Sequence, residues 1–332
     1  MILVDYSGIC MGAFFARGSG PDEGLLRHFI LNSLRMNNAR FRNEYGKMVI
    51  CCDGGTWRKD YYPEYKANRK KTREESDVDW TSVFNTFGKV QQEISENLPF
   101  DVIHEYGAEA DDIIATLVKE TQDFGKHEPI MIVSADKDFI QLQRYGNVKQ
   151  WSPLTKKFIT HDNPVRYLRE HIFRGDAGDG VPNVLSSDDT LCNEDKRQTP
   201  LSKKKIDSWC DAMDRDGTNG LHDIMPTQAF RNYQRNNRVI NLDNIPEEIT
   251  DKIIEKYIEQ KESIQEILNS SEITSLMSEE KIIEILGMID RNEYKRRQSP
   301  PGIKITSLAF GRDRRYPISS DYKFSYKNYT SS

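Results

Sequence analysis

Acidic side chains in this sequence stand at or shortly after the ends of short apolar runs. They are Asp5, Asp53, Glu109, Asp111, Asp112, Asp136 and Asp138. The pattern is clearest in the stretch S-A-D-K-D-F at 134–139, which follows the apolar run Ile130–Val133. Taken alone, those two aspartates are explained by a solvated turn, and the acids at 109–112 by capping of the helix that begins there.

Taken together, the acids point to divalent metal chemistry. Like charges held close together cannot all stay ionised unless a cation compensates them. Hard carboxylate oxygens, without His or Cys among them, select Mg²⁺ or Mn²⁺, and these ions also bind substrate phosphate. Two such ions roughly 4 Å apart can activate a water molecule and stabilise the leaving oxygen when a phosphodiester is cleaved. We therefore expect two ions, Mg²⁺ with Mn²⁺ as a substitute.

A further acidic pair, Asp176 and Asp179, stands in the stretch G-D-A-G-D-G-V-P at 175–182. Its glycines permit a tight backbone turn. By itself this stretch is explained equally well as an ordinary loop.

The acids need a scaffold, and the apolar runs predict one. Four runs read as buried strands: Ile2–Val4, Met48–Cys52, Val102–Tyr106 and Ile130–Val133. They alternate with helical patterns such as Leu25–Met36 and Ile113–Val118. This alternation predicts an α/β fold with a mostly parallel central sheet flanked by helices. The carboxyl ends of parallel strands share one edge, where ligands bind, so the acids would meet there.

The later chain has a different character. Strand signals fade after about Gly175, and residues 246–290 have a helical pattern. We expect a catalytic core over residues 1–175, with a basic arch at about 54–86, followed by a smaller, mainly helical DNA-binding domain over 176–332. From residue 291 the tail has ten Lys plus Arg against three acids, a net charge of +7, and several tyrosines. We expect it to contact DNA or a replication partner.

The composition indicates where the protein works and which partners it can have. The chain has 332 residues, a net charge of -5 and five cysteines without C-x-x-C spacing. We expect a reduced, intracellular, cytoplasmic protein, in the host cell if the source is a phage, that is monomeric and has no membrane segment. The mild overall acidity by itself argues against nucleic acid as a partner. Metal-binding acids can hide a basic surface elsewhere, however.

Such a surface is predicted at Trp57–Arg73, with seven Lys plus Arg against two acids. A charge run is usually a solvated face. That explanation leaves the interleaved Trp57, Tyr61, Tyr62 and Tyr65 unexplained. A groove that follows phosphates and stacks bases uses both residue types together.

The acidic motifs, taken in order along the chain, resemble the 5′ nuclease (flap endonuclease) family. They are Asp5, Asp53, E-A-D-D at 109–112, S-A-D-K-D at 134–138 and G-D-A-G-D at 175–179. The stretches H-F-I-L-N-S at 28–33, R-E-E-S at 73–76 and N-V-K-Q-W-S-P at 147–153 resemble the bacteriophage ribonuclease H members of that family. The resemblance covers roughly residues 1–260.

This resemblance implies a PIN-like core and a magnesium-dependent 5′ to 3′ exonuclease and flap endonuclease with ribonuclease H activity. Such an enzyme removes RNA primers and adjacent DNA from 5′ ends during lagging-strand replication. The implied partners are DNA with 5′ flaps, forks or nicks, RNA–DNA hybrid, single-strand-binding protein and other replisome components.

The resemblance also assigns roles by position. The first ion would be held by Asp5, Asp53, Glu109 and Asp111, with Asp112 adjacent, and the second by Asp136, Asp138, Asp176 and Asp179. In the arch motif P-E-Y-K-A-N-R at 63–69, Lys66 and Arg69 would contact the scissile phosphate and Tyr65 would stack on the displaced nucleotide. Arg58 matches a basic position just upstream. Wider DNA contacts would come from Lys70, Lys71, Arg73, Lys203, Lys204 and Lys205.

One departure from the family pattern concerns duplex binding. Many members follow the glycine–aspartate motif with a glycine-rich helix-three-turn-helix that binds potassium. Here an acidic and polar insertion, Asn183–Thr199, takes its place, and basic residues return only at 203–205. We expect those lysines to carry duplex binding, which leaves a potassium requirement in doubt.

Three other functions compete with this one. A PIN-type ribonuclease shares the acidic sheet edge but lacks an arch, so the basic aromatic stretch argues against it. A haloacid-dehalogenase-like phosphatase needs a second acid two residues after the first, where this chain has Ser7. A noncatalytic protein that binds branched DNA has no need to keep Asp or Glu at every acidic position.

Overall fold

The computed structural model of the chain describes residues 1–16, 22–122 and 127–269, without the side chains of residues 70, 71 and 261–269. The basic tyrosine-rich tail from residue 291 therefore lies outside the described residues. So do the side chains of Lys70 and Lys71, for which DNA contact was predicted.

A six-stranded sheet, in the order β3-β2-β1-β4-β5-β6, forms the centre of the molecule. Its strands are β1 (Ile2–Asp5), β2 (Met48–Cys52), β3 (Asp101–His104), β4 (Ile130–Val133), β5 (Val148–Ser152) and β6 (Lys157–Ile159). Only β6 runs antiparallel to its neighbour. Asp5 is in register with Cys51, and Cys52 with His104, so β1, β2 and β3 end at the same edge. The predicted mostly parallel sheet is confirmed.

The four predicted strands are present, with β3 ending two residues earlier than expected. Strands β5 and β6 were not predicted as strands. The reason lies in the composition of β5, which is V-K-Q-W-S rather than an apolar run. Its Gln150 is buried and donates to the backbone oxygen of Ser134, so this polar side chain satisfies its hydrogen bonds inside the protein.

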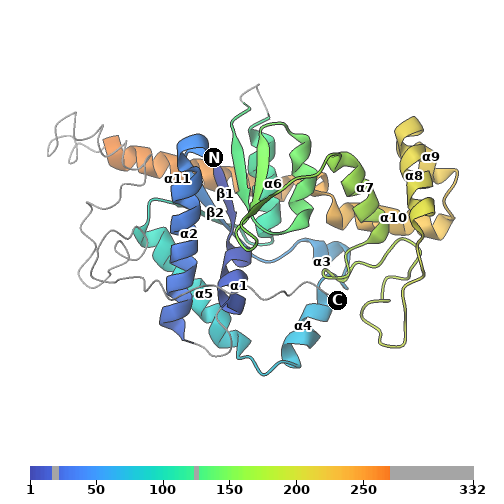
Figure 1. The fold of residues 1–332 in the computed structure, drawn as a ribbon, viewed down its shortest axis with the longest axis horizontal. Coiled ribbons are helices and arrows are strands. Elements are labelled where there is room, and N and C mark those ends of the chain that lie inside the picture. The colour runs from blue at the N-terminus through green and yellow to red at the C-terminus, as the bar shows by residue number, and fades with distance from the viewer. Residues whose placement is uncertain (17–21, 123–126, 270–332) are drawn as a thin grey trace.

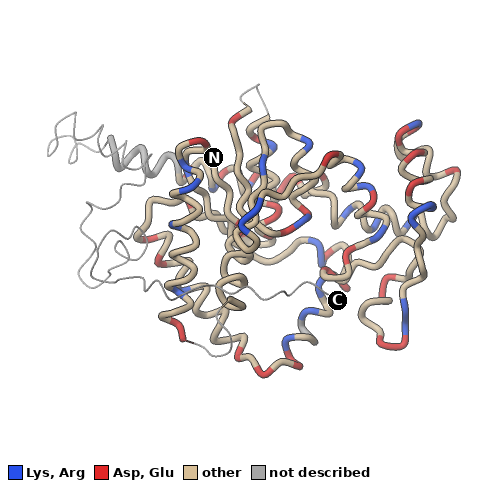
Figure 2. The backbone as a smooth tube through the Cα atoms, in the orientation of Figure 1, with Lys and Arg blue, Asp and Glu red and all other residues tan. Residues whose placement is uncertain are grey.

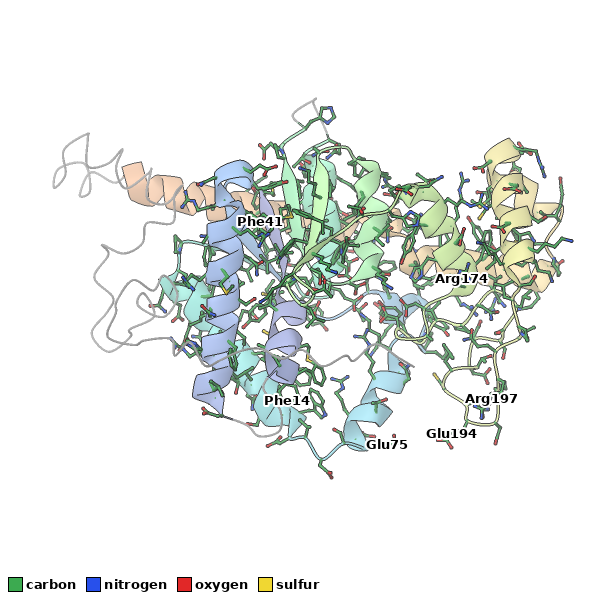
Figure 3. All side chains as sticks on the ribbon, viewed as in Figure 1. Phe14, Phe41, Glu75, Arg174, Glu194 and Arg197 are labelled. Carbon is green, nitrogen blue, oxygen red and sulfur yellow. The ribbon has the colours of Figure 1, made fainter. Side chains whose placement is uncertain are left out.

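Helices cover both faces of the sheet (Figure 1). On one face, α1 (Tyr6–Ala16), α2 (Glu23–Tyr45) and α5 (Trp80–Asn97) build an apolar core. Phe14 and Phe41, labelled in Figure 3, mark this side. On the other face, α6 (Ala110–Glu120), the 3₁₀ helix η2 (Lys137–Arg144) and α11 (Glu247–Asn269) build a second core.

A third apolar cluster holds the helical part together, at the right of Figure 1. It is built by α7 (Pro164–Arg174), α8 (Lys203–Asp216), α9 (Asn219–His222), α10 (Thr227–Ile240) and the connection from α7 to α8, and the 3₁₀ helix η3 (Leu242–Asn244) follows. Tyr62 and Tyr65 also pack into this cluster. The expected division of the chain at residue 175 stays a prediction.

The basic segment forms two short helices, α3 (Arg58–Tyr61) and α4 (Ala67–Glu74). The backbone N–H of Lys66 donates to the backbone oxygen of Asp179 at 2.7 Å, which fixes the base of the arch against the glycine–aspartate loop. Gly180 comes so close to Glu64 that an added Cβ would lie 2.9 Å from the Glu64 backbone oxygen. Glycine at this position therefore allows the contact.

Within the described part of the chain, no helix combines the length and the apolar character needed to cross a membrane.

Candidate active site at the carboxyl edge of the sheet

Backbone contacts between the ends of β2 and β3 set the first part of the site. Gly54 donates to the backbone oxygen of Ala108 at 2.8 Å and accepts from Gly107 at 2.9 Å. A Cβ at position 54 would lie 1.9 Å from the backbone oxygen of Glu105, so a larger residue would push the two segments apart. This close approach brings Asp53 next to the start of α6, where the backbone N–H of Ala110 donates to its Oδ1 at 2.7 Å.

Asp5 at the end of β1 is held by two donors. The backbone N–H of Gly8 donates to Oδ1 and the Ser134 hydroxyl to Oδ2, both at 2.8 Å. Asp53 accepts in a similar way from the Ser7 hydroxyl at 2.5 Å. Burial raises the pKa of Asp5, although the Gly8 hydrogen bond opposes the shift. Both carboxylates are therefore oriented by neutral donors, which leaves their negative charge uncompensated by these contacts.

Two more acids on this edge also have raised pKa values. Burial raises the pKa of Asp111 well above its usual range, and the charge of Asp136 adds to the effect. Burial and the charge of Asp138 raise the pKa of Asp136 to about 7. Carboxyl groups crowded in this way resist ionisation unless a cation is present.

Asp112, which was predicted to lie beside the ligands of the first ion, has its carboxylate occupied by protein partners. Its side chain has no exposed surface and pairs with Arg58 through both carboxylate oxygens, at 2.8 and 2.9 Å. It also accepts from the backbone N–H of Glu109 at 2.9 Å, as a capping residue does at a helix start. Asp112 therefore positions α6 and Arg58 rather than presenting a free carboxylate to an ion.

Arg58 differs from its prediction in the same way. Its side chain is 3% exposed and binds Asp112, Glu109 and the backbone oxygen of Val239. A guanidinium group with these partners is not available to a phosphate. Its position instead ties the arch to α6 and α10.

Lys66 and Arg69 do face the acids, as predicted. The Lys66 Nζ lies 2.5 Å from Glu109 Oε1 and 3.5 Å from Asp179 Oδ2, and Arg69 pairs with Asp179 as well. Burial alone would lower the pKa of Lys66, but the charges of Asp179 and Glu109 raise it above its usual value. Lys66 is therefore a fixed positive charge beside predicted ligands of both ions.

Tyr65 is buried, and its hydroxyl oxygen lies 2.7 Å from Asp179 Oδ2 and 3.0 Å from Glu109 Oε2, either of which can accept its single proton. The ring packs in the helical core and presents no open face in this arrangement. Its predicted stacking on a displaced nucleotide stays a prediction.

The other end of the site contains a residue that the sequence did not suggest. His171 on α7 places its Nε2 3.1 Å from Asp138 Oδ1 and 3.5 Å from Asp176 Oδ2. Burial alone would lower the pKa of His171, but these carboxylates raise it to about 10. Burial alone would raise the pKa of Asp176, but His171 lowers it. His171 thus lies beside two of the acids predicted to hold the second ion, and the expectation of oxygen ligands stays a prediction.

These groups open onto a cavity of about 510 Å³. Its lining includes residues from β1, from the end of β4, from α7 and from the glycine–aspartate loop: Asp5, Asp136, Asp138, Tyr167, His171 and Asp176. The structure thus gathers the predicted acids at one edge, with Lys66 and Arg69 beside them. The predicted role of each residue toward an ion or a phosphate stays a prediction.

The outer basic residues lie elsewhere. Lys203, Lys204 and Lys205 are exposed in the first turn of α8, and Arg73 is exposed at the end of α4. In Figure 1, α8 lies on the far side of the helical part from the sheet, and Figure 2 shows charges of both signs along that part. The loop before α8, with Glu194 and Arg197 labelled in Figure 3, extends from the same end. DNA binding by these residues stays a prediction.

Three residues of this site escaped the sequence analysis. Ser7 and Ser134, to which the sequence analysis assigned no role, orient Asp53 and Asp5. Ser7 stands two residues after Asp5 and Ser134 opens the motif S-A-D-K-D, so position could have suggested them. His171 stands four residues after Tyr167, on whose ring it stacks with centroids 6.0 Å apart. Nothing in the sequence near His171 reveals its contact with Asp138, which lies 33 residues earlier.

Crowded carboxylates with raised pKa values suit divalent cations, which are hard acceptors for carboxylate oxygen. Positive groups on the arch stand next to them, where a phosphate bound to such ions would lie. A parallel sheet that carries crowded carboxylates and basic side chains at the ends of its strands is typical of metal-dependent phosphodiesterases.

Comparison with known proteins agrees with this class. Residues 1–170 match the family described as "5'-3' exonuclease, N-terminal resolvase-like domain". Residues 166–289 match the family described as "T4 RNase H, C terminal". The chain is 35% identical over 267 residues to Ribonuclease H of Enterobacteria phage T4, which covers 77% of this chain and 85% of the relative. The chain therefore belongs to the 5′–3′ exonuclease family, and the predicted enzyme, a metal-dependent 5′ nuclease, is confirmed.

Solved structures show the same fold. A zinc-bound T5 5′-exonuclease aligns with a TM-score of 0.58 and 16% identity, over 78% of this chain and 98% of that chain. A T5 D15 flap endonuclease in a complex with DNA and metal ions aligns with a TM-score of 0.56 and 18% identity, over 78% of this chain and 97% of that chain. A short second similarity, 40% over 77 residues, relates the chain to the glutamine-dependent NAD(+) synthetase of Aquifex aeolicus, of which it covers 13%.

Proposed function

We propose that this chain removes RNA and adjacent DNA from 5′ ends during lagging-strand replication, acting on flaps, forks, nicks and RNA–DNA hybrids. The observation that carries this proposal is the meeting of two groups of opposite charge. Acids from separate segments of the fold line one cavity, and Lys66 and Arg69 of the arch pair with Glu109 and Asp179, two further predicted ligands. The T5 relative whose structure contains DNA and metal ions supports a DNA substrate.

We propose Mg²⁺ as the usual ion, with Mn²⁺ as a substitute. Asp5, Asp53, Glu109 and Asp111 would hold one ion, and Asp136, Asp138, Asp176 and Asp179 the other. When bound, these ions lower the pKa of a water molecule and stabilise charge on the phosphate oxygens.

The residues of this chain supply orientation and charge. Ser7 and Ser134 keep the carboxylates of Asp53 and Asp5 turned toward the edge. Lys66 pairs with Glu109 in the present arrangement. Once a divalent cation compensates the acids, the Lys66 ammonium is free to bind a phosphate oxygen and stabilise the charge that develops there.

Arg69 can likewise change its partner from a carboxylate to a phosphate oxygen. Its side chain is half exposed and pairs with Asp179, a predicted ligand of the second ion. An exposed pair of this kind contributes little to stability, so its partner can change at small cost. Arg69 would then orient the phosphate together with Lys66.

The remaining expectations are part of the same proposal. A monomer working with single-strand-binding protein and other replisome components, in the cytoplasm, is consistent with a replication nuclease. Exposed Lys203–Lys205 would bind duplex DNA by charge, which predicts binding that weakens as salt increases.

A cleavage assay tests the proposal. The substrates are a 5′-labelled DNA flap and a nicked RNA–DNA hybrid, each with and without Mg²⁺. The proteins are the wild type, Asp136→Asn, and Asp162→Asn as a matched control, since Asp162 is exposed on the loop before α7. We expect short labelled 5′ products that require Mg²⁺, are lost with Asp136→Asn and persist with the control.

Two other outcomes would replace the proposal. Binding of the flap by all three proteins without cleavage would make the chain a noncatalytic branched-DNA protein. Cleavage of single-stranded RNA without dependence on a 5′ end would favour a PIN-type ribonuclease.

A further inference from the structure

His171 is the one imidazole among the described residues that forms a metal-binding group with two further ligands. Atoms of Asp138, His171 and Asp176 that can bind a metal all lie within 4.8 Å of one another. They come from η2, from α7 and from the loop that follows α7. Because α7 packs along η2, two elements distant in sequence place these groups together.

The Nε2 atom of His171 is buried and has no hydrogen-bond partner. It lies near two carboxylate oxygens, at 3.1 and 3.5 Å, but neither contact has the geometry of a hydrogen bond. The nitrogen and the two carboxylates therefore lie close together without a hydrogen bond between them. A cation shared by the imidazole and both carboxylates would satisfy all three.

The ring is also held in place. Tyr167 stacks on it with an interplanar angle of 14° and centroids 6.0 Å apart. Both residues line the same cavity as Asp136 and Asp138. The Nε2 is therefore fixed at the wall of the pocket rather than free to turn into solvent.

We propose that His171 is a nitrogen ligand of the ion held by Asp138 and Asp176, so that this half of the site prefers a divalent transition ion such as Mn²⁺ to Mg²⁺. The inference rests on the proposed function, because it assigns the second ion to this place. The chemical reason is that Mg²⁺ binds almost only oxygen, whereas first-row transition ions also accept imidazole.

A different role for the same residue is a positive counter-charge, with a protonated imidazole between the two carboxylates. Two substitutions separate the roles. His171→Lys keeps a positive charge but has no lone pair to give to an ion when protonated, whereas His171→Gln removes both. His161→Gln is the matched control, because His161 also contacts the Tyr167 ring, at 5.0 Å between centroids, but is exposed and outside the pocket lining.

The experiment uses the full chain without DNA and Mn²⁺ alone as the probe. Electron spin echo envelope modulation of bound Mn²⁺ reports a coupled ¹⁴N nucleus directly. We expect the ¹⁴N signal in the wild type and in His161→Gln, and its loss in both His171 variants. Circular dichroism of each variant verifies that it is folded.

A second readout follows ion preference. In competition titrations, the ratio of Mn²⁺ to Mg²⁺ affinity should fall about 10-fold or more in both His171 variants. If His171 is only a counter-charge, His171→Lys should instead keep the wild-type ratio.

Two results would overturn the inference. One is bound Mn²⁺ without ¹⁴N modulation in the wild type, and the other is modulation that persists in both His171 variants. Both leave the proposed nuclease intact, since cleavage with Mg²⁺ is measured separately. Failure of Mn²⁺ to bind at all would remove the inference, and it removes the proposed function only if cleavage also proves independent of metal.

Discussion

Aspartates in two regions of the molecule show opposite electrostatic behaviour. In the helical part, Asp188 pairs with Arg231 and Arg235, and although burial alone would raise the pKa of Asp188, these arginines lower it. At the sheet edge, burial raises the pKa values of Asp5 and Asp136. The same residue type is therefore compensated by the protein in one region and left short of positive charge in the other.

This difference separates structural acids from functional ones. Asp188 anchors the insertion after α7, where the Tyr62 hydroxyl also donates to its backbone oxygen at 2.6 Å. The edge contains one acid of the same structural kind, Asp112, whose partner Arg58 is equally buried. Glu109 and Asp179 are paired with Lys66 and Arg69, whereas Asp5 and Asp136 form no ion pair among the described residues. We expect these two acids to depend on a cation from outside the chain. Four substitutions test this division.

The largest effect is expected for Asp136→Asn. Loss of a negative ligand should lower the cleavage rate by about 10³-fold, which corresponds to roughly 4 kcal/mol of transition-state stabilisation. Affinity for the flap should stay the same or increase, because a negative charge near phosphate is removed. Single-turnover cleavage and fluorescence anisotropy measure the two quantities. A rate within a few-fold of wild type would place Asp136 among the structural acids.

Arg58→Met should destabilise the fold instead. It leaves Asp112 buried without a counter-charge, a change that typically costs about 3–5 kcal/mol. Urea denaturation measures the free energy of unfolding. Arg73→Met is the control, since Arg73 is exposed on the same arch and surface substitutions change stability by about 0.5 kcal/mol or less. Equal stabilities for the two variants would contradict the structural role of Arg58.

Lys66→Ala should affect catalysis more than binding. Removal of a positive group aimed at developing phosphate charge costs about 10²–10³-fold in rate by analogy with other oxyanion donors. Flap affinity should change only a few-fold, because other basic residues remain. Lys59→Ala, at an exposed position on α3, provides the comparison. An unchanged rate for Lys66→Ala would remove its assigned role.

Asp188→Asn should have the smallest effect, and the effect should depend on pH. The folded pKa of Asp188 lies below its unfolded value, so its contribution to stability is present above about pH 4 and is lost as pH falls through the lowered pKa. At pH 7 the variant should lose at most about 1.5–3 kcal/mol, the range for hydrogen bonds to charged groups, because Arg231 is half exposed. Unfolding curves at several pH values should converge with wild type under acid conditions. A constant difference at every pH would show that the charge of Asp188 is not the cause.

The sequence predicted those strands correctly that consist almost entirely of buried apolar residues. Strands β1, β2 and β4 are continuous apolar runs, and the acids that follow them meet at the edge as expected. Strand β5 was missed because its polar Gln150 finds partners only in the folded chain. Such partners cannot be read from local composition.

The sequence could not distinguish the roles of Asp111 and Asp112, which are neighbours on one helix. Asp111 and Asp112 are separated by about 100° around α6, so they point in different directions. The partner of Asp112 is Arg58, more than 50 residues earlier in the chain. His171 was missed for the same reason, since its partners come from η2 and from the loop after α7. Long-range contacts of this kind decide the details of the site.

Asp5, Asp111 and Asp136, whose pKa values burial raises, form no ion pair among the described residues, and we expect a divalent ion to supply their counter-charge. The most direct measurement is the thermal unfolding temperature of the DNA-free chain as Mg²⁺ or Mn²⁺ is added, for wild type, Asp136→Asn and Asp162→Asn. An ion at 100 times its dissociation constant adds about 2.7 kcal/mol to the stability of the folded state. We predict a clear rise in unfolding temperature for wild type and Asp162→Asn, and a much smaller rise for Asp136→Asn. An unfolding temperature that does not respond to either ion, in any of the three proteins, would contradict the account.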